Sequence, residues 1–589
     1  MSALCLHPPL AAPIRLGWPS PRRPLRWLGL ISFWSCMGLS SSSLAQVPSF
    51  PSPIFPPPLP SPEQVPERLP PPGELLRPPT ELPPLPTEPD LPEDAETVTV
   101  RAFQVEGSTV FTPEELAAAT APFVNRPITF TELLQARTAI TQLYIDKGYI
   151  TSGAFIPAGQ VISEGVVIIQ VIEGRLAAVE VTGLRRLSPR YIRDRITLQV
   201  RAPLNVNQVL VALQMLQLDP LVERLSAELV AGLQPGESVL AITAEEAQAF
   251  RTQVVLDNAR PESIGSFQRQ VQFEHLNLLG YGDALRVAYA NTDGSHQFSG
   301  GYRLPINARN GTLEVTYEQT WSQVIEPEVF RLIDLKGQAR SLHLTYRQPV
   351  IQTPRQELAL GLGVARRESE TTILGEPFPI SPGSDDQGKT RLTELKFFQD
   401  WLQRHSNSVL ALRSEFNFGL GLGATTNPTP PDGHFFLWRT QAQWVRELAP
   451  DTLLVLRANA QVSDRPLPSL EQFGLGGADS VRGYPQDLQL ADMGVFGSAE
   501  ARFPLYRMPQ GEGVLQVIPF LDIGKGWNRG NQGQVDANPL LAVGVGLRWN
   551  WRDRITARVD WGIPLLSVGE QSGGIDESRI LFSIVGRPF

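Results

Sequence analysis

The chain has 589 residues and a formal net charge of −9, with 51 lysines and arginines against 60 aspartates and glutamates. This length exceeds what one ordinary domain needs, and an acidic chain without a basic block argues against nucleic-acid binding. The two cysteines, Cys5 and Cys36, both lie in the first 45 residues. Without that segment the chain would use neither disulfides nor thiol chemistry.

Residues 1–45 have the organisation of an export signal. Arg22, Arg23 and Arg26 precede the short apolar stretch Trp27–Leu39, and small residues at Ser43–Ala45 suit a cleavage site. A single membrane anchor is the alternative, but the apolar stretch is short for a bilayer. No later stretch has the length of apolar sequence that a membrane-spanning helix needs, which leaves a β-barrel as the possible means of crossing.

Residues 46–97 are dominated by proline, with runs at Pro56–Pro58, Pro70–Pro72 and Pro78–Pro79. With so few backbone donors this segment favours polyproline II over helix or sheet. We predict a semi-rigid periplasmic linker. A ligand for a proline-binding module is the alternative, and nothing in the segment singles out such a partner.

A repeat follows the linker. Val105-x-Gly107 with Thr112-Pro113 recurs as Val181-x-Gly183 with Ser188-Pro189, at identical offsets. Each copy predicts a strand, a glycine turn and a helix start, and the surrounding periodicity extends each into a β-α-α-β-β unit. We place the two units at residues 98–175 and 176–248, each of normal size for a small domain. In the first unit Thr112 and Glu115 predict a capping box, with Pro113 at the first helical position.

The first unit resembles the polypeptide-transport-associated (POTRA) domain of two-partner secretion transporters. The resemblance lies in Tyr144-x-x-x-Gly148-Tyr149, Pro157-x-x-Gln160, Gly165 and Val171-Ile172-Glu173-Gly174. The openings of both units resemble POTRA domains generally. An unrelated pair of α+β modules is the alternative. An exposed sheet edge and a groove beside a helix, as the resemblance implies, would suit capture of an extended client by strand addition.

From residue 251 to the C-terminus, period-two alternation replaces helical periodicity. Along Leu541–Trp551, for example, large apolar residues alternate with Ala542, Gly544, Gly546, Arg548 and Asn550. A soluble β-sandwich also alternates. Charged and small residues share one face across many segments, however, as a water-filled lumen requires.

Sixteen candidate strands are separated by connections that alternate between long and short. Long ones include residues 463–493 and 564–578, and short ones include 404–406 and 552–553. Long loops on one rim and tight turns on the other are typical of outer-membrane barrels, and an even strand number places both chain ends in the periplasm. The predicted fold is therefore α+β POTRA domains followed by an all-β transmembrane barrel of about 16 antiparallel strands.

Val481-Arg482-Gly483-Tyr484 resembles the (Val/Ile)-Arg-Gly-(Tyr/Phe) signature of the superfamily that contains two-partner secretion transporters and barrel-assembly insertases. In that superfamily the long loop between strands 11 and 12 folds back into the lumen. The resemblance implies that Arg482 pairs with Asp522, within Phe520-Leu521-Asp522-Ile523-Gly524 on strand 13. A guanidinium in a narrow lumen suits a bidentate carboxylate partner. A solvated arginine on an exposed loop is the alternative.

The terminal strand Ile580–Phe589 resembles the signal that the barrel-assembly machinery reads during biogenesis, with Phe589 as its last aromatic. Arg587 stands where many such signals have a second aromatic. The alternative is simply a last strand that closes the barrel.

No catalytic constellation emerges from the sequence. The six histidines are scattered without metal-ligand spacing, and neither a nucleophile elbow nor a Walker loop occurs. We expect no enzyme activity, cofactor, metal or nucleic-acid partner. The expected function is an outer-membrane pore, surrounded by lipid, that carries a secreted exoprotein client from periplasm to cell surface without nucleotide. A barrel-assembly insertase and a passive porin are the alternatives.

Overall fold

The computed structural model describes residues 72–77, 97–160, 162, 165–326, 332–509, 512–530, 538–569 and 573–588. The predicted signal peptide at residues 1–45 lies outside these ranges. Within the described residues, no helix is long and apolar enough to cross a membrane.

The first α+β domain has strand β3 (Ala102–Glu106), helices α2 (Pro113–Thr120) and α3 (Phe130–Asp146), and strands β5 (Gly153–Phe155) and β6 (Val166–Ile172). Its sheet has the order β3-β6-β5, with β3 parallel and β5 antiparallel to β6. A small ladder of β2 (Val98–Val100) and β4 (Arg126–Ile128) and a 3₁₀ turn η1 (Ala121–Phe123) complete the domain. The predicted order of elements is therefore present.

Helix α2 begins where the sequence predicts. Glu115 N donates to the Thr112 side chain, while Thr112 N donates to the Glu115 carboxylate, so the capping box is confirmed. Helix α3 has a second capping box, between Thr129 and Glu132, which is not among the predicted features. Both boxes satisfy backbone donors that a helix start leaves unpaired.

The second α+β domain repeats the same order of elements. Strand β7 (Arg175–Thr182) is followed by helices α4 (Pro189–Gln199) and α5 (Val206–Gln217) and strands β8 (Val222–Ala231) and β9 (Glu237–Glu246). Strand β7 is parallel and β8 antiparallel to β9. Ser188 precedes α4 without making a side-chain cap, unlike Thr112 in the first domain. The sheet gains a fourth strand, β1 (Leu76–Arg77), which pairs with β8 and follows the short helix α1 (Pro72–Leu75).

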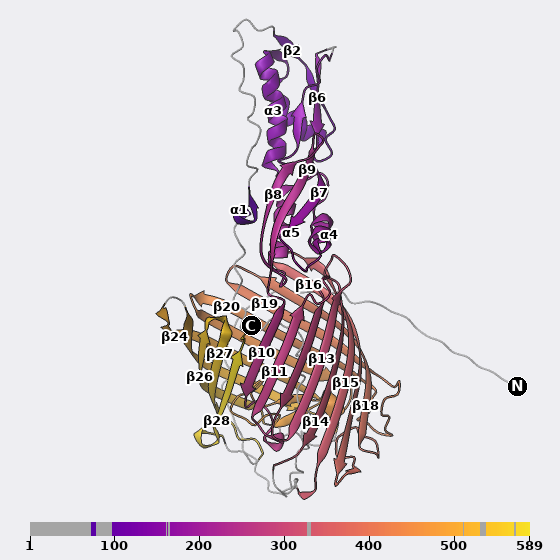
Figure 1. Ribbon diagram of the computed structural model, residues 1–589, viewed down its shortest axis with the longest axis vertical. Coiled ribbons are helices and arrows are strands. Elements are labelled where there is room, and N and C mark those ends of the chain that lie inside the picture. Colours follow the sequence, from indigo (N-terminus) through magenta and orange to yellow (C-terminus); the bar gives the residue numbers. More distant parts are fainter. Residues whose placement is uncertain are drawn as a thin grey trace, which may run out of the picture. The chain divides into compact units, whose positions relative to one another are not determined.

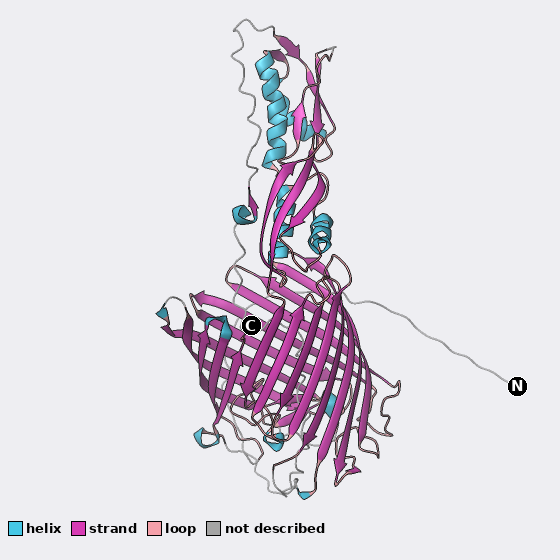
Figure 2. Cartoon of the chain, viewed as in Figure 1, coloured by secondary structure: helices cyan, strands magenta, loops and turns pink. Residues whose placement is uncertain are grey.

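The rest of the chain forms a closed antiparallel β-barrel (Figures 1 and 2). Among the described residues its sixteen strands are β10 (Phe250–Asp257), β11 (Gln268–Leu276), β12 (Ala284–Asn291), β13 (Ser295–Pro305), β14 (Thr312–Gln323), β15 (Lys336–Gln352), β16 (Gln356–Ile373), β18 (Lys389–Arg404), β19 (Ser408–Leu420), β20 (Phe435–Ala449), β21 (Thr452–Ser463), β24 (Met493–Arg507), β25 (Gly513–Trp527), β26 (Leu540–Trp551), β27 (Ile555–Pro564) and β28 (Arg579–Gly586). The two-residue β17 (Glu376–Pro377) pairs only with the end of β16. The barrel closes where β28 pairs with β10.

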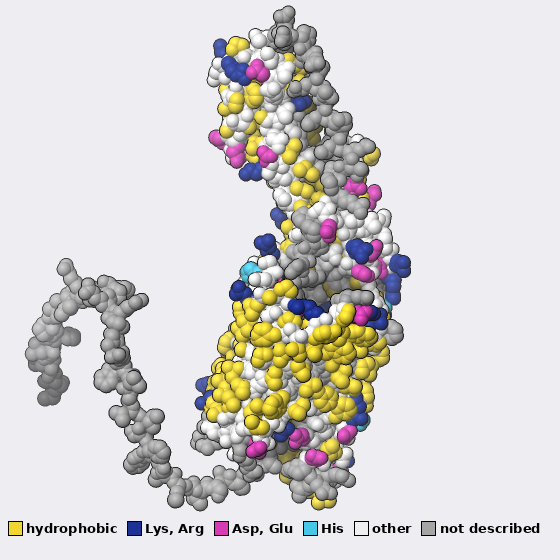
Figure 3. Space-filling view, turned by 90° about the vertical axis from the view of Figure 1, so that its left-hand side faces the viewer, with side chains coloured by type: hydrophobic (Ala, Val, Ile, Leu, Met, Phe, Trp, Pro, Cys, Tyr) yellow, Lys and Arg dark blue, Asp and Glu magenta, His cyan; other side chains and the backbone are white. Residues whose placement is uncertain are grey.

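On the face shown in Figure 3, the outer surface of the barrel carries a broad hydrophobic belt with charged residues above and below it. Strand β25 shows how the pleat divides the two faces. Leu521 and Ile523 are 46% and 50% exposed, whereas Asp522 between them is fully buried. Because successive side chains point to opposite faces, the apolar set faces lipid and Asp522 faces the interior.

Connections between strands also differ between the two rims. The segments 374–388, 421–434 and 464–492 are long, whereas residues 353–355 and 450–451 form tight turns. This is the asymmetry that the sequence predicts.

Glu173 is the centre of a hydrogen-bond cluster in the first α+β domain. Its carboxylate accepts from Thr109 N at 2.7 Å, Val110 N at 3.2 Å and the Tyr144 hydroxyl at 2.8 Å. Burial favours the neutral carboxyl, but the hydrogen bonds outweigh it, so the pKa of Glu173 lies below its ordinary value. The same carboxylate thereby fixes the end of β6 to helix α3 and to the turn before α2.

We expect Glu173→Gln to loosen helix α3, because a neutral amide cannot replace these charge-assisted bonds, each worth about 1.5–3 kcal/mol. A lowered pKa stabilises the fold above the ordinary carboxyl range, and that contribution is lost as pH falls through the lowered value. Acid should therefore loosen the wild-type helix more than the variant helix. Hydrogen exchange of α3 amides in the full chain measures this, with Glu114→Gln, at an exposed position, as the matched control. Equal protection in both variants would contradict the assignment.

Candidate functional site: an anchored loop inside the barrel

The segment 464–492 connects β21 to β24 and carries the Val-Arg-Gly-Tyr motif. Short strands β22 (Phe473–Leu475) and β23 (Gln489–Ala491) pair antiparallel and form its stem. Val481, Arg482 and Tyr484 are between 0% and 1% exposed. The motif is therefore enclosed by the barrel.

Arg482 binds the wall of the barrel through Asp522 on β25. Its Nε donates to Asp522 Oδ2 at 2.7 Å, and its Nη2 donates to Asp522 Oδ1 at 2.9 Å. The backbone N–H of Arg482 also donates to Oδ2, at 3.2 Å. The guanidinium lies over the Phe520 ring, 3.5 Å from its centroid. This combines a bidentate ion pair with a cation–π contact, a geometry that lysine cannot reproduce.

Two further carboxylates surround the Arg482 guanidinium. Arg482 Nη1 lies 3.1 Å from Glu500 on β24 and 3.5 Å from Asp560 on β27. Arg502 and Arg558 each approach Glu500 to 2.7 Å, and Arg558 Nε also bonds Asp560 at 2.8 Å. Three guanidiniums thus share three carboxylates, and the carboxylates that surround Arg482 come from three different strands.

Val481 and Gly524 form an apolar contact beside the ion pair. A Cβ at Gly524 would lie 3.0 Å from Val481 and 2.8 Å from Leu475. Gly524 therefore leaves the space that the loop fills. Its role as part of the anchor, with Phe520 and Asp522, remains our proposal.

Gly483 and Tyr484 bring the loop against the strands β26 and β27. Gly483 has φ +102°, and a Cβ there would lie 3.0 Å from the backbone of Gly562 on β27. Only glycine combines this backbone conformation with such a close approach. The Tyr484 hydroxyl donates to Leu566 O at 2.8 Å and lies 3.2 Å from Leu541 O, which satisfies a phenol buried among apolar side chains.

A second anchor, Glu471, lies in the same segment and is not among the site residues that the sequence predicts. Glu471 ends a 3₁₀ turn η3 (Ser469–Glu471) and is 1% exposed. Its carboxylate pairs with Arg367 on β16 and lies 3.7 Å from Arg439 on β20. Gln461 donates to the Glu471 carbonyl at 2.8 Å. A second carboxylate, the fully buried Glu394 on β18, lies 4.0 Å from Arg367 and 3.0 Å from Lys396. The loop thus presents a cation to one group of charged strand residues and a carboxylate to another. An isolated acid in a loop has no sequence signal for this role, because its partners lie on strands far from it in the chain.

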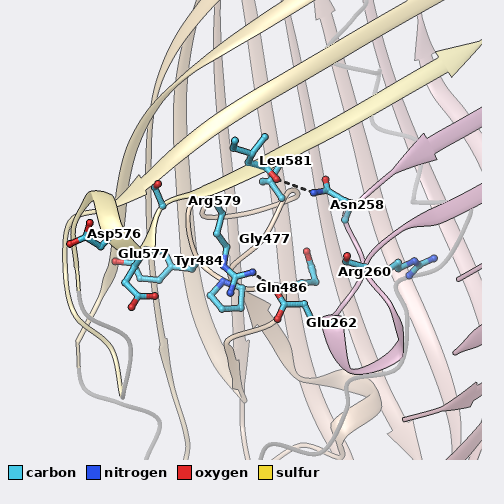
Figure 4. A pocket seen from close by; sticks show the side chains of 15 residues that line it. Asn258, Arg260, Glu262, Gly477, Tyr484, Gln486, Asp576, Glu577, Arg579 and Leu581 are labelled. Atoms are coloured by element: carbon cyan, nitrogen blue, oxygen red, sulfur yellow. Dashed lines mark hydrogen bonds and ion pairs between the residues drawn. The ribbon is translucent and has the colours of Figure 1, made fainter. Parts of the chain in front are cut away.

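A cavity of about 400 Å³ lies between the loop and the closing seam of the barrel (Figure 4). Tyr484 and Gln486 line its loop side, and Asn258 and Arg579 line its seam side. The Asn258 side chain donates to Ile580 O at 2.9 Å and accepts from Phe582 N at 2.8 Å. It continues the β10–β28 pairing beyond the four register pairs of that seam.

The remaining predicted site residue, Phe589, lies outside the described residues. Among the described residues, no group of three or more His, Cys, Asp or Glu side chains could hold a metal ion.

Comparison with known proteins places the chain in a family. Residues 236–549 match the haemolysin secretion/activation protein ShlB/FhaC/HecB family, and residues 98–174 match its ShlB-type POTRA domain. The chain belongs to this family. It is therefore an outer-membrane transporter of two-partner secretion, whose POTRA domains are periplasmic. The resemblance seen in the sequence is confirmed.

Two curated relatives match this chain over most of their own length. The outer membrane transporter CdiB of Dickeya dadantii (strain 3937) is 23% identical over 79% of this chain and 83% of its own. The heme/hemopexin transporter protein HuxB of Haemophilus influenzae (strain 86-028NP) is 21% identical over 77% of this chain and 80% of its own.

Solved structures share the fold. CdiB from Escherichia coli superposes with a TM-score of 0.64, at 23% identity over 86% of this chain and 93% of its own. BamA from Haemophilus ducreyi lacking POTRA domains 1–3 gives a TM-score of 0.51, at 14% identity over 84% of this chain and 100% of its own. The predicted combination of POTRA domain and sixteen-stranded barrel is thus confirmed.

We expect Arg482→Ala to release the tip of the loop, because breaking a buried ion pair costs about 3–5 kcal/mol. Exchanging the two charges, Arg482→Asp with Asp522→Arg, should not restore the anchor, because the new carboxylate would face Glu500 and Asp560. Ion conductance of the purified protein in planar bilayers should rise in both variants and stay unchanged in Arg465→Ala, which alters a partly exposed arginine of the same loop. Wild-type conductance in the exchanged variant would show that Glu500 and Asp560 do not contribute to the anchor.

Glu471→Gln should loosen the other end of the loop, because a neutral amide cannot form the ion pairs that Glu471 makes with Arg367 and Arg439. Proteolysis within residues 464–475 measures the loosening, with Glu376→Gln at an exposed position as the control. If the loop acts as one brace, combining Glu471→Gln with Arg482→Ala should raise conductance by more than the sum of the single effects. Simple additivity would mean that the two anchors act independently.

Proposed function

We propose that the chain exports an unfolded exoprotein through the barrel lumen, and that the segment 464–492 controls this passage. The anchoring of Arg482 to the barrel wall supports the proposal most directly. A loop held by two oppositely charged groups stays in place without fuel, and it can be displaced only when another chain offers compensating contacts.

The proposed client is a secreted protein that crosses the periplasm in an extended form. Strand β5 at the edge of the first domain pairs only with β6 within the described residues, and Phe155 on it is 41% exposed. An open edge with an exposed aromatic suits strand addition. Relatives are named as CdiB and as a heme/hemopexin transporter; we infer a client of the same general kind, a large secreted partner.

We further propose that the chain is not an enzyme and that folding of the client outside the cell drives export. The boundaries 46–97 for the linker, 98–175 and 176–248 for the two POTRA domains and 251–589 for the barrel belong to this proposal. So does engagement of Phe589 by the barrel-assembly machinery during biogenesis.

A photo-crosslinking amino acid at Phe155 should capture the client in the periplasm. Capture should be absent when the same amino acid replaces Arg190, an exposed residue on helix α4 of the second domain and away from any sheet edge. The captured protein must also disappear from the medium when the gene for this chain is deleted. A captured protein that still reaches the medium without this chain would contradict the proposal.

A disulfide across the closing seam separates export from barrel insertion. Val255 and Val585 are register partners on β10 and β28, and both cysteines of the chain lie in the predicted signal segment. We expect Val255→Cys with Val585→Cys to leave export unchanged, because the client passes through the lumen. An insertase would need this seam to open, so loss of function on oxidation, with recovery on reduction, would favour that alternative.

A further inference from the structure

One short part of the proline-rich linker lies on the second α+β domain. Helix α1 and strand β1 together comprise Pro72–Arg77, which we call the linker segment (Figure 1). Strand β1 runs parallel to β8, with Leu76 opposite Ala227 and Arg77 opposite Glu228. The linker segment thereby adds a fourth strand to the edge of the β8-β9-β7 sheet.

Leu75 anchors the linker segment. Its side chain is 1% exposed and belongs to the same hydrophobic core as Val209 and Leu213 of α5 and Leu229 of β8. Leu76 packs partly buried against this core, whereas Glu74 beside it is exposed. A leucine of a linker therefore completes the core of a domain that follows it by about a hundred residues.

The composition of the linker explains why this segment can pair with the sheet. Gly73–Arg77 is a run of five residues without proline, and every other proline-free run between Val47 and Pro92 has three residues or fewer. Proline has no backbone N–H and cannot donate to a ladder. Pro70–Pro72 and Pro78–Pro79 enclose the run and limit the added strand to a few residues.

The first domain shows the same edge without an added strand. Strands β5 and β8 occupy equivalent places in the two β-α-α-β-β units, and each pairs antiparallel with the last strand of its unit. In the described residues β5 has no second neighbour, whereas β8 has β1. The linker segment therefore covers the β8 edge of the second domain. The equivalent β5 edge of the first domain is open in the described residues.

We propose that the β8 edge and its leucine pocket form a docking site for an extended, leucine-bearing segment of the client, and that the linker segment occupies this site at rest. This inference rests on the proposed function for the identity of the client, but occupation by the linker segment does not. Only two register pairs, the buried Leu75 and the partly buried Leu76 hold the linker segment, so an incoming strand with more backbone donors can displace it. The tether keeps its local concentration high, in the millimolar range, so weak or mismatched strands do not compete.

A disulfide tests where the linker segment lies. Adjacent strands are about 4.8 Å apart, within the range that a disulfide bridges. We expect Arg77→Cys with Glu228→Cys to crosslink on mild oxidation of the purified full chain. Arg77→Cys with Glu223→Cys should not crosslink, because Glu223 is five residues away along the same strand. Equal crosslinking of both pairs would overturn the assigned register.

Peptide binding tests whether the edge accepts a segment in trans. The probe is a fluorescent synthetic peptide with the sequence of residues 70–79, titrated into the detergent-solubilised full chain. Leu75→Asp in the protein should free the pocket and bind the peptide at least tenfold more tightly than the wild type. Leu75→Ala should give an intermediate affinity, and Glu74→Ala, at the exposed neighbouring position, should behave as the wild type.

The crosslinked Arg77→Cys/Glu228→Cys protein should not bind the peptide until it is reduced. A peptide with both leucines replaced by aspartate should not bind any variant. Equal binding to wild type and Leu75→Asp, or binding to neither, would overturn the docking site. Because these measurements involve no transport, their failure is distinguishable from a failure of the export proposal.

Discussion

The arrangement inside the barrel depends on one buried guanidinium. Arg482 is 1% exposed, and a charge removed from water is tolerated only when carboxylates and hydrogen bonds replace its hydration. Asp522 supplies bidentate bonds, and Glu500 and Asp560 supply additional negative charge at 3.1 and 3.5 Å. These carboxylates lie on three different strands, so the loop can be seated only when β24, β25 and β27 are in register.

This constraint explains the small residues around the loop. Gly483 and Gly562 allow two backbones to approach each other, and Gly524 leaves room for Val481. Glu471 is also a buried charged residue of the loop, of opposite sign to Arg482, and it is stabilised by an ion pair with Arg367. The two anchors together hold a long segment inside a barrel whose outer face is apolar. A charge-based attachment is strong as long as its partners are present, yet it contains no covalent link that transport would have to break.

The two α+β domains use their sheet edges differently despite the same order of elements. One edge is open in the described residues, and the other carries a piece of the chain's own linker. The difference comes from five residues without proline in a segment otherwise rich in it. Five consecutive residues with backbone N–H groups are what a strand needs, and Gly73–Arg77 supplies them.

The sequence alone determined the architecture. Period-two alternation predicted the strands and their two faces, the lengths of the connections predicted the rims, and Thr112 with Glu115 predicted the start of α2. The pairing of Arg482 with Asp522 came from a family resemblance, whereas period two indicated only that Phe520 and Asp522 share a face.

Only the tertiary structure decided which charges meet. Glu500, Asp560 and Arg558 join the cluster because strand register places them opposite one another, and register is not encoded in the alternation of one strand. Glu471 and Leu75 were missed for the same reason. Each is an ordinary residue in its local sequence, and its partners lie far from it along the chain. Contacts between side chains on neighbouring barrel strands, or between a sheet edge and the linker, depend on the whole fold. The alternation of apolar and polar residues that predicts each strand is a local property of the sequence.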